Sequence, residues 1–235
     1  MWTLFGSDGS GSAAVEMALM RCALPYQVQR ASTWEPDSAQ QQLRQVNPLG
    51  QIPTLQFDDG SVMTESAAIL IELGLRHPAS GLLPLAAAAR AQALRGLVYI
   101  ASNCYAAIGV IDYPERWCEG GDEHTHGKLR LGARARLHGY WSVFADQFAT
   151  AQPFLGGASP GALDLLAAVV SRWSGARAHL KQHRPALLDL LAAVVSRWSG
   201  ARAHLKQHRP ALLALLQRVE AQPDLAPVFA RHWPG

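Results

Sequence analysis

A 25-residue segment occurs twice in succession in this chain, with no difference between the copies. The unit LDLLAAVVSRWSGARAHLKQHRPAL fills residues 163–187 and again residues 188–212. Repeat architectures need about three or more stacked units, and their terminal copies usually diverge. Two identical copies therefore indicate a duplicated segment inside a globular fold, and we look for function in the rest of the 235 residues.

The charge of the chain follows from the same duplication. The net charge is +3, and each copy of the repeat contributes four cationic residues and one aspartate. Without the extra copy the charges balance, so the basic character is no evidence for a nucleic-acid partner. A content of 49% hydrophobic and 17% charged residues is typical of a folded globular chain with a substantial core.

Cysteine usage and the N-terminus favour the cytoplasm. Cys22, Cys104 and Cys118 are odd in number and widely spaced, which suits reduced thiols. The chain opens with a strand pattern and lacks the charged region and apolar run of a signal peptide. The uncharged, apolar stretch at residues 96–111 is too short to span a bilayer. We expect a cytoplasmic protein without a membrane partner.

The first part of the chain alternates between strand and helix patterns. The predicted elements are a strand at residues 2–5, a Gly/Ser turn at 6–11, a helix with Val15, Ala18, Leu19 and Cys22 on one face, a strand at 25–28, a hairpin formed by 51–57 and 61–63, and a helix at 65–76. Cys22 therefore belongs to an apolar stripe, and its predicted role is core packing.

After the linker at residues 77–84 only helical patterns remain. Two apolar stripes at helical spacing run through Leu94, Leu97, Val98, Ala101, Cys104, Tyr105 and Ile108, and through Leu137, Tyr140, Trp141, Phe144 and Phe148. The fold class is therefore α/β followed by all-α, with domains at residues 1–80 and 85–235.

The repeat belongs to the helical domain. Residues 163–173 are predicted as a buried helix with Asp164 near its start, and residues 176–184 as a shorter helix. Pro185 then opens a further helix. Because PALLDLL and PALLALL share their apolar register, a hybrid helix at 185–198 can imitate the last predicted helix at 210–221. Two arrangements compete, and the sequence does not rank them.

The segment at residues 47–69 carries the chemistry. Pro53 stands inside a strand pattern, where proline removes a hydrogen-bond donor, and proline also makes a cis peptide bond accessible. A cis bond would turn the backbone N–H and C=O of Ile52 outward, where an extended peptide could pair with them. Helix amides at Glu65 and Ser66 would bind a carboxylate, and the Glu65 carboxylate would bind an ammonium group. Together these groups suit a zwitterionic peptide.

With the motifs NPLGQIPTL at residues 47–55 and ESAAI at residues 65–69, the chain resembles the glutathione transferase family. The resemblance implies a thioredoxin-like N-terminal domain, a helical-bundle C-terminal domain and a homodimer. It implies that glutathione binds through Gln51, Ile52, Pro53, Glu65 and Ser66. Glutathione is then a co-substrate, and the second substrate is a small, mostly apolar electrophile. No metal cofactor is expected.

The residue that activates the glutathione thiol is predicted in the turn GSDGSGS. Its hydroxyls belong to Ser7, Ser10 and Ser12. In serine-type members of the family the catalytic serine would fall at Gly9 or, with a gap of one residue, at Ser10. We therefore choose Ser10 as the catalytic residue and place Ser12 beside the ligand, although a helix cap is the favoured interpretation of Ser12. Cysteine-type members carry their cysteine near Gly11, so its absence argues against thiol transfer through a mixed disulfide.

Aromatic residues in the helical domain are candidates for the co-substrate pocket. Tyr105, Tyr113 and Trp117 lie on or just after the helix that faces the active site in the family, but aromatic residues at helical spacing are as often core. The loop CEGGDEHTH at residues 118–126 holds potential metal ligands, but with no second cluster elsewhere a solvated loop is the better interpretation. Two alternatives to a conjugating enzyme remain: a glutathione-dependent disulfide reductase, and a non-catalytic interaction module.

Overall fold

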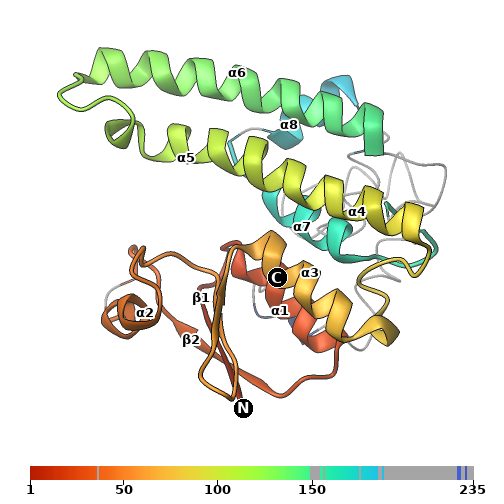
Figure 1. Cartoon of the computed structure of the whole chain (residues 1–235). Coiled ribbons are helices and arrows are strands. Elements are labelled where there is room, and N and C mark those ends of the chain that lie inside the picture. The colour runs from red at the N-terminus through yellow and green to blue at the C-terminus, as the bar shows by residue number, and fades with distance from the viewer. Residues whose placement is uncertain are drawn as a thin grey trace.

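The computed structural model describes residues 1–35, 37–148, 154–155, 157–174, 176–184, 187, 227–228 and 231. All the strands of its one sheet lie between Trp2 and Thr64 (Figure 1). Beyond them, the described residues form helices, turns and a single β-bridge between Phe154 and Gly157. An α/β part followed by a helical part is the predicted order.

The sheet has four strands in the order β2-β1-β3-β4. The strands are β1 (Trp2–Gly6), β2 (Tyr26–Arg30), β3 (Thr54–Gln56) and β4 (Val62–Thr64). β1 runs parallel to β2 and antiparallel to β3, and β3 and β4 form the predicted hairpin. In that hairpin Thr54 lies opposite Thr64, so the residue before β3 and the residue after β4 are neighbours.

Helices cover both faces of the sheet. α1 (Ser12–Arg21) and α3 (Ser66–Arg76) lie on the face toward the helical part, and α2 (Gln40–Val46) lies on the other (Figure 1). Because successive strand residues point to opposite faces, Leu4 enters the main core while Phe5 packs with Leu43 of α2. The sequence did not predict α2, because Leu43 is its one buried residue and makes no apolar stripe.

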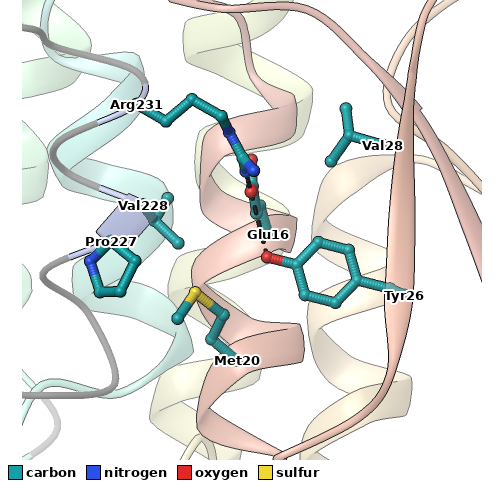
Figure 2. Close-up of a pocket in the computed structure, with 7 residues that line it drawn as sticks. All are labelled: Glu16, Met20, Tyr26, Val28, Pro227, Val228 and Arg231. Carbon is teal, nitrogen blue, oxygen red and sulfur yellow. Dashed lines mark hydrogen bonds and ion pairs between the residues drawn. The ribbon is translucent and has the colours of Figure 1, made fainter.

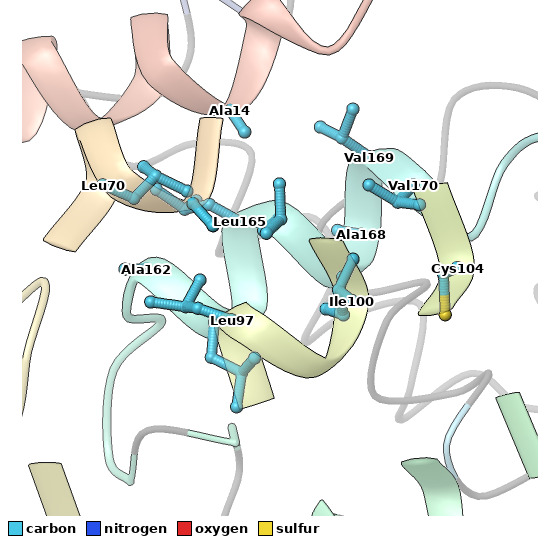
Figure 3. Close-up of a cluster of buried hydrophobic side chains, with 14 of the residues drawn as sticks. Ala14, Leu70, Leu97, Ile100, Cys104, Ala162, Leu165, Ala168, Val169 and Val170 are labelled. Atoms are coloured by element: carbon cyan, nitrogen blue, oxygen red, sulfur yellow. The ribbon is translucent and has the colours of Figure 1, made fainter. Parts of the chain in front are cut away.

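The helical part consists of α4 (Ala87–Tyr99), a π-helical segment η2 (Ile100–Tyr105), α5 (Ala106–Asp112), α6 (Glu123–Phe148), α7 (Ala162–Val170) and α8 (Ala176–His183). α6 packs along α5, and α7 packs against α1, α3 and α4. Every residue of α7 is buried. Figure 3 shows the apolar side chains gathered around it, with Ala14 from α1, Leu70 from α3 and Leu97 from α4. α7 therefore joins the two parts through one core.

The continuous helical run Ala87–Asp112 differs from its prediction in two respects. Val98, expected in the apolar stripe, is 55% exposed. The run is also longer than the uncharged stretch, because it has 26 residues, and with a mean hydropathy of 1.4 over an 18-residue window it is long and apolar enough to cross a membrane. Leu97, Ile100 and Cys104 from this run are fully buried in the core beside α7, as expected for a core helix.

The first copy of the repeat supplies α7 and α8, as predicted. The buried Asp164 carboxylate accepts hydrogen bonds from the backbone N–H of Leu155 at 2.7 Å and of Gly161 at 2.9 Å, and so anchors the start of α7. The second copy, and with it the predicted helices at 185–198 and 210–221, lies outside the described residues.

A described piece of the C-terminus returns to the first helix. Pro227, Val228 and Arg231 border a pocket of about 330 Å³ against α1 and β2 (Figure 2). There the fully buried Glu16 accepts a hydrogen bond from the Tyr26 hydroxyl at 3.0 Å and pairs with Arg231. The contacts neutralise a buried carboxylate that would otherwise destabilise α1.

Candidate functional site

The loop before β3 is held by side-chain hydrogen bonds. The amide of the buried Asn47 donates to the carbonyl of Gln51 at 3.1 Å and to the hydroxyl of Thr54 at 2.9 Å, and Thr54 itself donates to the Gln51 carbonyl at 2.8 Å. The peptide bond between Ile52 and Pro53 is cis, as the sequence predicts. Within the described part of the chain neither the N–H nor the C=O of Ile52 makes a hydrogen bond. These two groups are free to pair with a ligand.

Beside this loop, across the hairpin, β4 passes into α3. Glu65 is exposed and occupies the position before the helix, with φ 64° and ψ 107°, while Ser66 is the first helical residue and 7% exposed. A positive φ for a glutamate costs about 1–3 kcal/mol, and such residues cluster at ligand sites. No side chain caps α3, so its first amides, next to Pro53, are available to a carboxylate.

The turn between β1 and α1 contains a closed cluster of serine hydroxyls. The Ser10 hydroxyl donates to the carbonyl of Ser7 at 2.7 Å, lies 2.8 Å from the Ser12 hydroxyl, and accepts from the Ser12 N–H at 3.2 Å. The Ser12 hydroxyl accepts from the N–H of Ser7 and can donate to its carbonyl, both at 3.2 Å. All three serines are buried. The cluster shapes the turn that begins α1.

The helix cap in this turn differs from the prediction. Gly11 is the N-cap of α1, and Ser12 is the first helical residue. The Ser12 hydroxyl binds backbone groups of Ser7 and caps no amide of the helix. Gly6 is required here as well, because a Cβ on it would come within 2.6 Å of the Ser12 side chain.

Tyr105 reaches this turn from the helical part. A Cβ placed on Gly11 would overlap the Tyr105 hydroxyl oxygen and would lie 3.8 Å from Cδ of Pro53. The Tyr105 hydroxyl therefore lies between the start of α1 and the loop before β3. Burial raises its pKa above the usual range, and the nearby Ser66 side chain acts in the opposite direction. The sequence does not predict the contact between Tyr105 and Gly11, because these residues lie far apart along the chain.

The other aromatic candidates are placed differently. Tyr113 is 36% exposed, and the guanidinium of Arg116 lies 4.0 Å from the centre of its ring. Trp117 is 60% exposed. Neither is a core residue. Tyr99, in contrast, donates to the carbonyl of Tyr140 at 2.9 Å, and burial raises its pKa to about 12. The structure thus brings Ser10, Ser12, Pro53, Ser66 and Tyr105 together, while Tyr113 and Trp117 follow on the surface beyond α5.

Two further sequence candidates are the loop at residues 118–126 and Cys22. Among the described residues no group of three or more His, Cys, Asp or Glu side chains could hold a metal ion, the loop at 118–126 included. Cys22 is half-buried beside a second pocket of about 440 Å³ that Arg21, Arg76 and Ser80 also line. Burial raises the pKa of the Cys22 thiol, which lowers its thiolate fraction at neutral pH.

Comparison with known proteins agrees with this geometry. A family model of the glutathione S-transferase N-terminal domain matches residues 12–75, the segment from α1 to α3. The uncharacterized GST-like protein YncG of Escherichia coli strain K12 is 29% identical over 174 residues, which cover 74% of this chain and 82% of that protein. Residues 12–75 thus match the N-terminal domain of glutathione S-transferases, and the chain is similar to GST-like proteins over most of its length.

Other proteins similar to this chain carry the same family name. Glutathione S-transferase GstA of Escherichia coli O157:H7 is 30% identical over 114 residues, 47% of this chain and 56% of that protein. A glutathione transferase homolog from Sulfitobacter, solved with bound glutathione, superposes with a TM-score of 0.71 at 22% identity and covers 98% of both chains. The glutathione S-transferase from Xylella fastidiosa superposes with a TM-score of 0.70 at 19% identity, and the match covers 99% of this chain and 98% of that one. The predicted fold, a thioredoxin-like domain followed by a helical domain, is confirmed.

Proposed function

We propose that this protein is a glutathione transferase, which binds glutathione and transfers its thiolate to small, electrophilic, mostly apolar molecules. The observation that carries the proposal is the meeting of three features at one end of the sheet: the unpaired backbone of Ile52, the uncapped start of α3, and the first turn of α1. The glutathione bound to the Sulfitobacter homolog supports it.

In the proposed complex, glutathione lies as an extended peptide beside β3. Its cysteinyl backbone pairs with the N–H and C=O of Ile52, next to Pro53, and adds a short strand to the sheet edge. Its γ-glutamyl carboxylate is held by the Ser66 hydroxyl and the first amides of α3, while its ammonium group meets the exposed Glu65. The exposed Gln51 side chain donates to the glycyl carboxylate.

The same placement directs the cysteinyl sulfur toward the first turn of α1, where Ser10 and Ser12 lie. The positive end of the helix dipole favours a thiolate there. The thiol proton passes to water, the electron pair that remains on sulfur forms the new S–C bond, and the leaving group departs with its own electron pair. We propose no metal in this step.

The acceptor molecule is proposed to bind on the helical side, against Tyr105 and the exposed aromatic rings of Tyr113 and Trp117. Apolar electrophiles suit these rings because stacking and burial both favour association. A homodimer, which the family resemblance implies, and a cytoplasmic location, which the cysteine usage and the N-terminal pattern favour, remain part of the proposal.

The test combines binding and turnover. Calorimetric titration with glutathione is expected to show binding, and incubation with glutathione and an aryl halide is expected to release halide. Turnover of a disulfide but not of the aryl halide would favour a glutathione-dependent reductase. An absence of both binding and turnover would favour a non-catalytic interaction module and contradict the proposal.

A further inference from the structure

Tyr105 occupies an unusual place in the helical backbone. It is the last residue of the π-helical segment Ile100–Tyr105, which interrupts the run from α4 to α5. Such wide turns are rare and frequently lie at functional sites. The two carbonyls of the preceding turn, those of Val98 and Tyr99, accept hydrogen bonds from Ser102 at 2.8 Å and from Asn103 at 3.1 Å. Side chains thus stabilise a local backbone that sets the direction of Tyr105.

The ring of Tyr105 is held and its hydroxyl is aimed at the candidate site. Trp173, just beyond α7, packs on the ring with 5.8 Å between ring centres. The hydroxyl oxygen fills the space that a side chain on Gly11 would enter, beside Pro53. These contacts fix the hydroxyl over the first turn of α1.

The hydroxyl of Tyr105 is also buried and makes no hydrogen bond within the described residues. Ser66 lies near enough to act on its pKa, but the pair lacks the geometry of a hydrogen bond. A buried polar group without a partner is costly and rare in folded proteins. Because burial raises the pKa of Tyr105, the phenol keeps its proton at neutral pH. It is therefore a ready donor for an acceptor that arrives with a ligand.

Ser10, the candidate from the sequence, has no hydrogen to spare. A hydroxyl has a single donor, and the Ser10 and Ser12 hydrogens are both used within the cluster, on the Ser7 carbonyl or on each other. To donate to a ligand, Ser10 would have to leave an acceptor 2.7 Å away inside a buried turn. Tyr105 needs no such rearrangement.

We propose that the Tyr105 hydroxyl, and not that of Ser10, donates the hydrogen bond that stabilises the glutathione thiolate. The inference rests on the proposed function, because it requires glutathione to bind with its sulfur at the start of α1. Tyr105 then acts as a catalytic residue supplied by the helical part, and it keeps its own proton throughout. Ser10 shapes the turn.

The decisive variant is Tyr105→Phe, compared with Ser10→Ala. The pKa of bound glutathione is measured from the thiolate absorbance and from the pH dependence of kcat/KM. Loss of a hydrogen bond to a charged group is expected to raise that pKa by about one to two units in Tyr105→Phe, with a smaller change in Ser10→Ala. The affinity for glutathione should change little, because the backbone of Ile52 and the start of α3 hold the peptide.

A matched control separates this role from a structural one. Tyr99→Phe removes another tyrosine hydroxyl from the same helical run, one that already has a partner in the carbonyl of Tyr140. It is expected to lower the melting temperature without moving the pKa of the thiol. Tyr105→Phe is expected to melt, without ligand, at a temperature no lower than that of the wild type, because the hydroxyl that it loses is unpaired.

The outcomes are distinct. Normal glutathione binding with an unmoved thiol pKa in Tyr105→Phe, or a larger shift in Ser10→Ala, overturns this inference and leaves the proposed function standing. A wild-type protein that does not bind glutathione overturns both.

Discussion

Glu65 and Ser66 stand where β4 passes into α3, and the backbone there does most of the proposed binding. The positive φ of Glu65 turns the chain so that the helix begins without a side-chain cap. Ile52 on the neighbouring loop likewise offers only its N–H and C=O. Side chains such as Asn47 act indirectly, because its amide holds the Gln51 carbonyl and the Thr54 hydroxyl in place. At the scale of residues, the site depends on backbone groups that a few side chains position.

Ser66→Ala tests the carboxylate site at the start of α3. The variant is expected to weaken glutathione binding by about 1–3 kcal/mol, because a charged carboxylate loses a hydrogen-bond donor. Calorimetry measures the change. Ser61→Ala is the matched control, since Ser61 is an exposed serine in the β3–β4 turn that bonds to Asp59 and lies apart from the helix start. Equal affinities in wild type and Ser66→Ala would mean that the carboxylate binds elsewhere.

At the scale of elements, α7 and α8 show how the repeat enters the fold. α7 is buried on all sides and its start depends on Asp164, whose partners Leu155 and Gly161 both precede the first copy. α8 packs on α6 through stacked histidine rings, with 4.7 Å between the centres of His138 and His179. Because these two partners directly precede the first copy, they favour that copy for α7.

Asp164→Ala and Asp189→Ala test that placement, because the two residues occupy the same position in identical copies. Asp164→Ala is expected to lower the free energy of unfolding by about 1–3 kcal/mol, since two backbone donors lose their acceptor. Asp189→Ala is expected to lower the free energy of unfolding by a smaller amount. Urea denaturation of both variants gives the comparison. The reverse order would show that the second copy occupies the place of α7.

Acid is expected to weaken the packing of α8 on α6. Burial lowers the pKa of His179, as do the neighbouring His138, His183 and Arg184, and its ring bonds to Ser142 at 2.8 Å. Asp146 pairs with Arg184 nearby. The unfolded chain protonates His179 more readily than the folded chain does. The stability that neutral His179 contributes is therefore present above about pH 6.5, and it is lost as pH falls toward the lowered pKa of the folded state.

The measurement is the melting temperature from pH 8 downward in wild type and in His179→Gln, which keeps a partner for Ser142. The variant is expected to lose less stability in acid. His124→Gln, at an exposed histidine near the start of α6, should follow the wild type. If His179→Gln and the wild type lose stability in parallel, another group is responsible.

At the scale of the whole molecule, the duplication adds length without adding to the proposed site. The residues proposed to bind the backbone and the carboxylates of glutathione all precede residue 70. The first copy of the repeat supplies both α7 and α8. The extra copy brings the apolar residues Leu190, Leu191, Val194 and Val195. Each such side chain forgoes roughly 1.5–3 kcal/mol if it is left exposed, so the extra copy must find cover or destabilise the chain.

Deletion of residues 188–212 is therefore expected to give a folded, glutathione-binding protein at least as stable as the duplicated one. Because the copies are identical, removal of either copy gives the same chain. Thermal melting and size-exclusion chromatography of the two proteins test this, and the single-copy form is expected to elute as a homodimer. A deletion variant that unfolds or loses glutathione binding would show that the second copy is part of the fold.

Local patterns in the sequence determined the two-part fold, the hairpin, the cis bond at Pro53 and the start of α3 beside it. Each follows from proline chemistry, turn residues or periodicity within a few neighbouring positions. Two features were not predicted in this way. α2 has too few buried residues to make a pattern, and Gly11 replaced Ser12 as the cap of α1 because the Ser12 hydroxyl found partners in the backbone of Ser7.

Only the tertiary structure decided which hydroxyl is free. The sequence shows Ser10, Ser12 and Tyr105 as polar side chains of similar chemistry, and nothing in their spacing tells which hydrogens are already used. The fold pairs the Ser10 and Ser12 hydroxyls with each other and with the Ser7 carbonyl, while in the described part of the chain the Tyr105 hydroxyl is buried without a partner over Gly11. Hydrogen-bond satisfaction depends on what the whole chain brings within about 3 Å, and residues that distant in sequence meet only when the two parts of the molecule pack together.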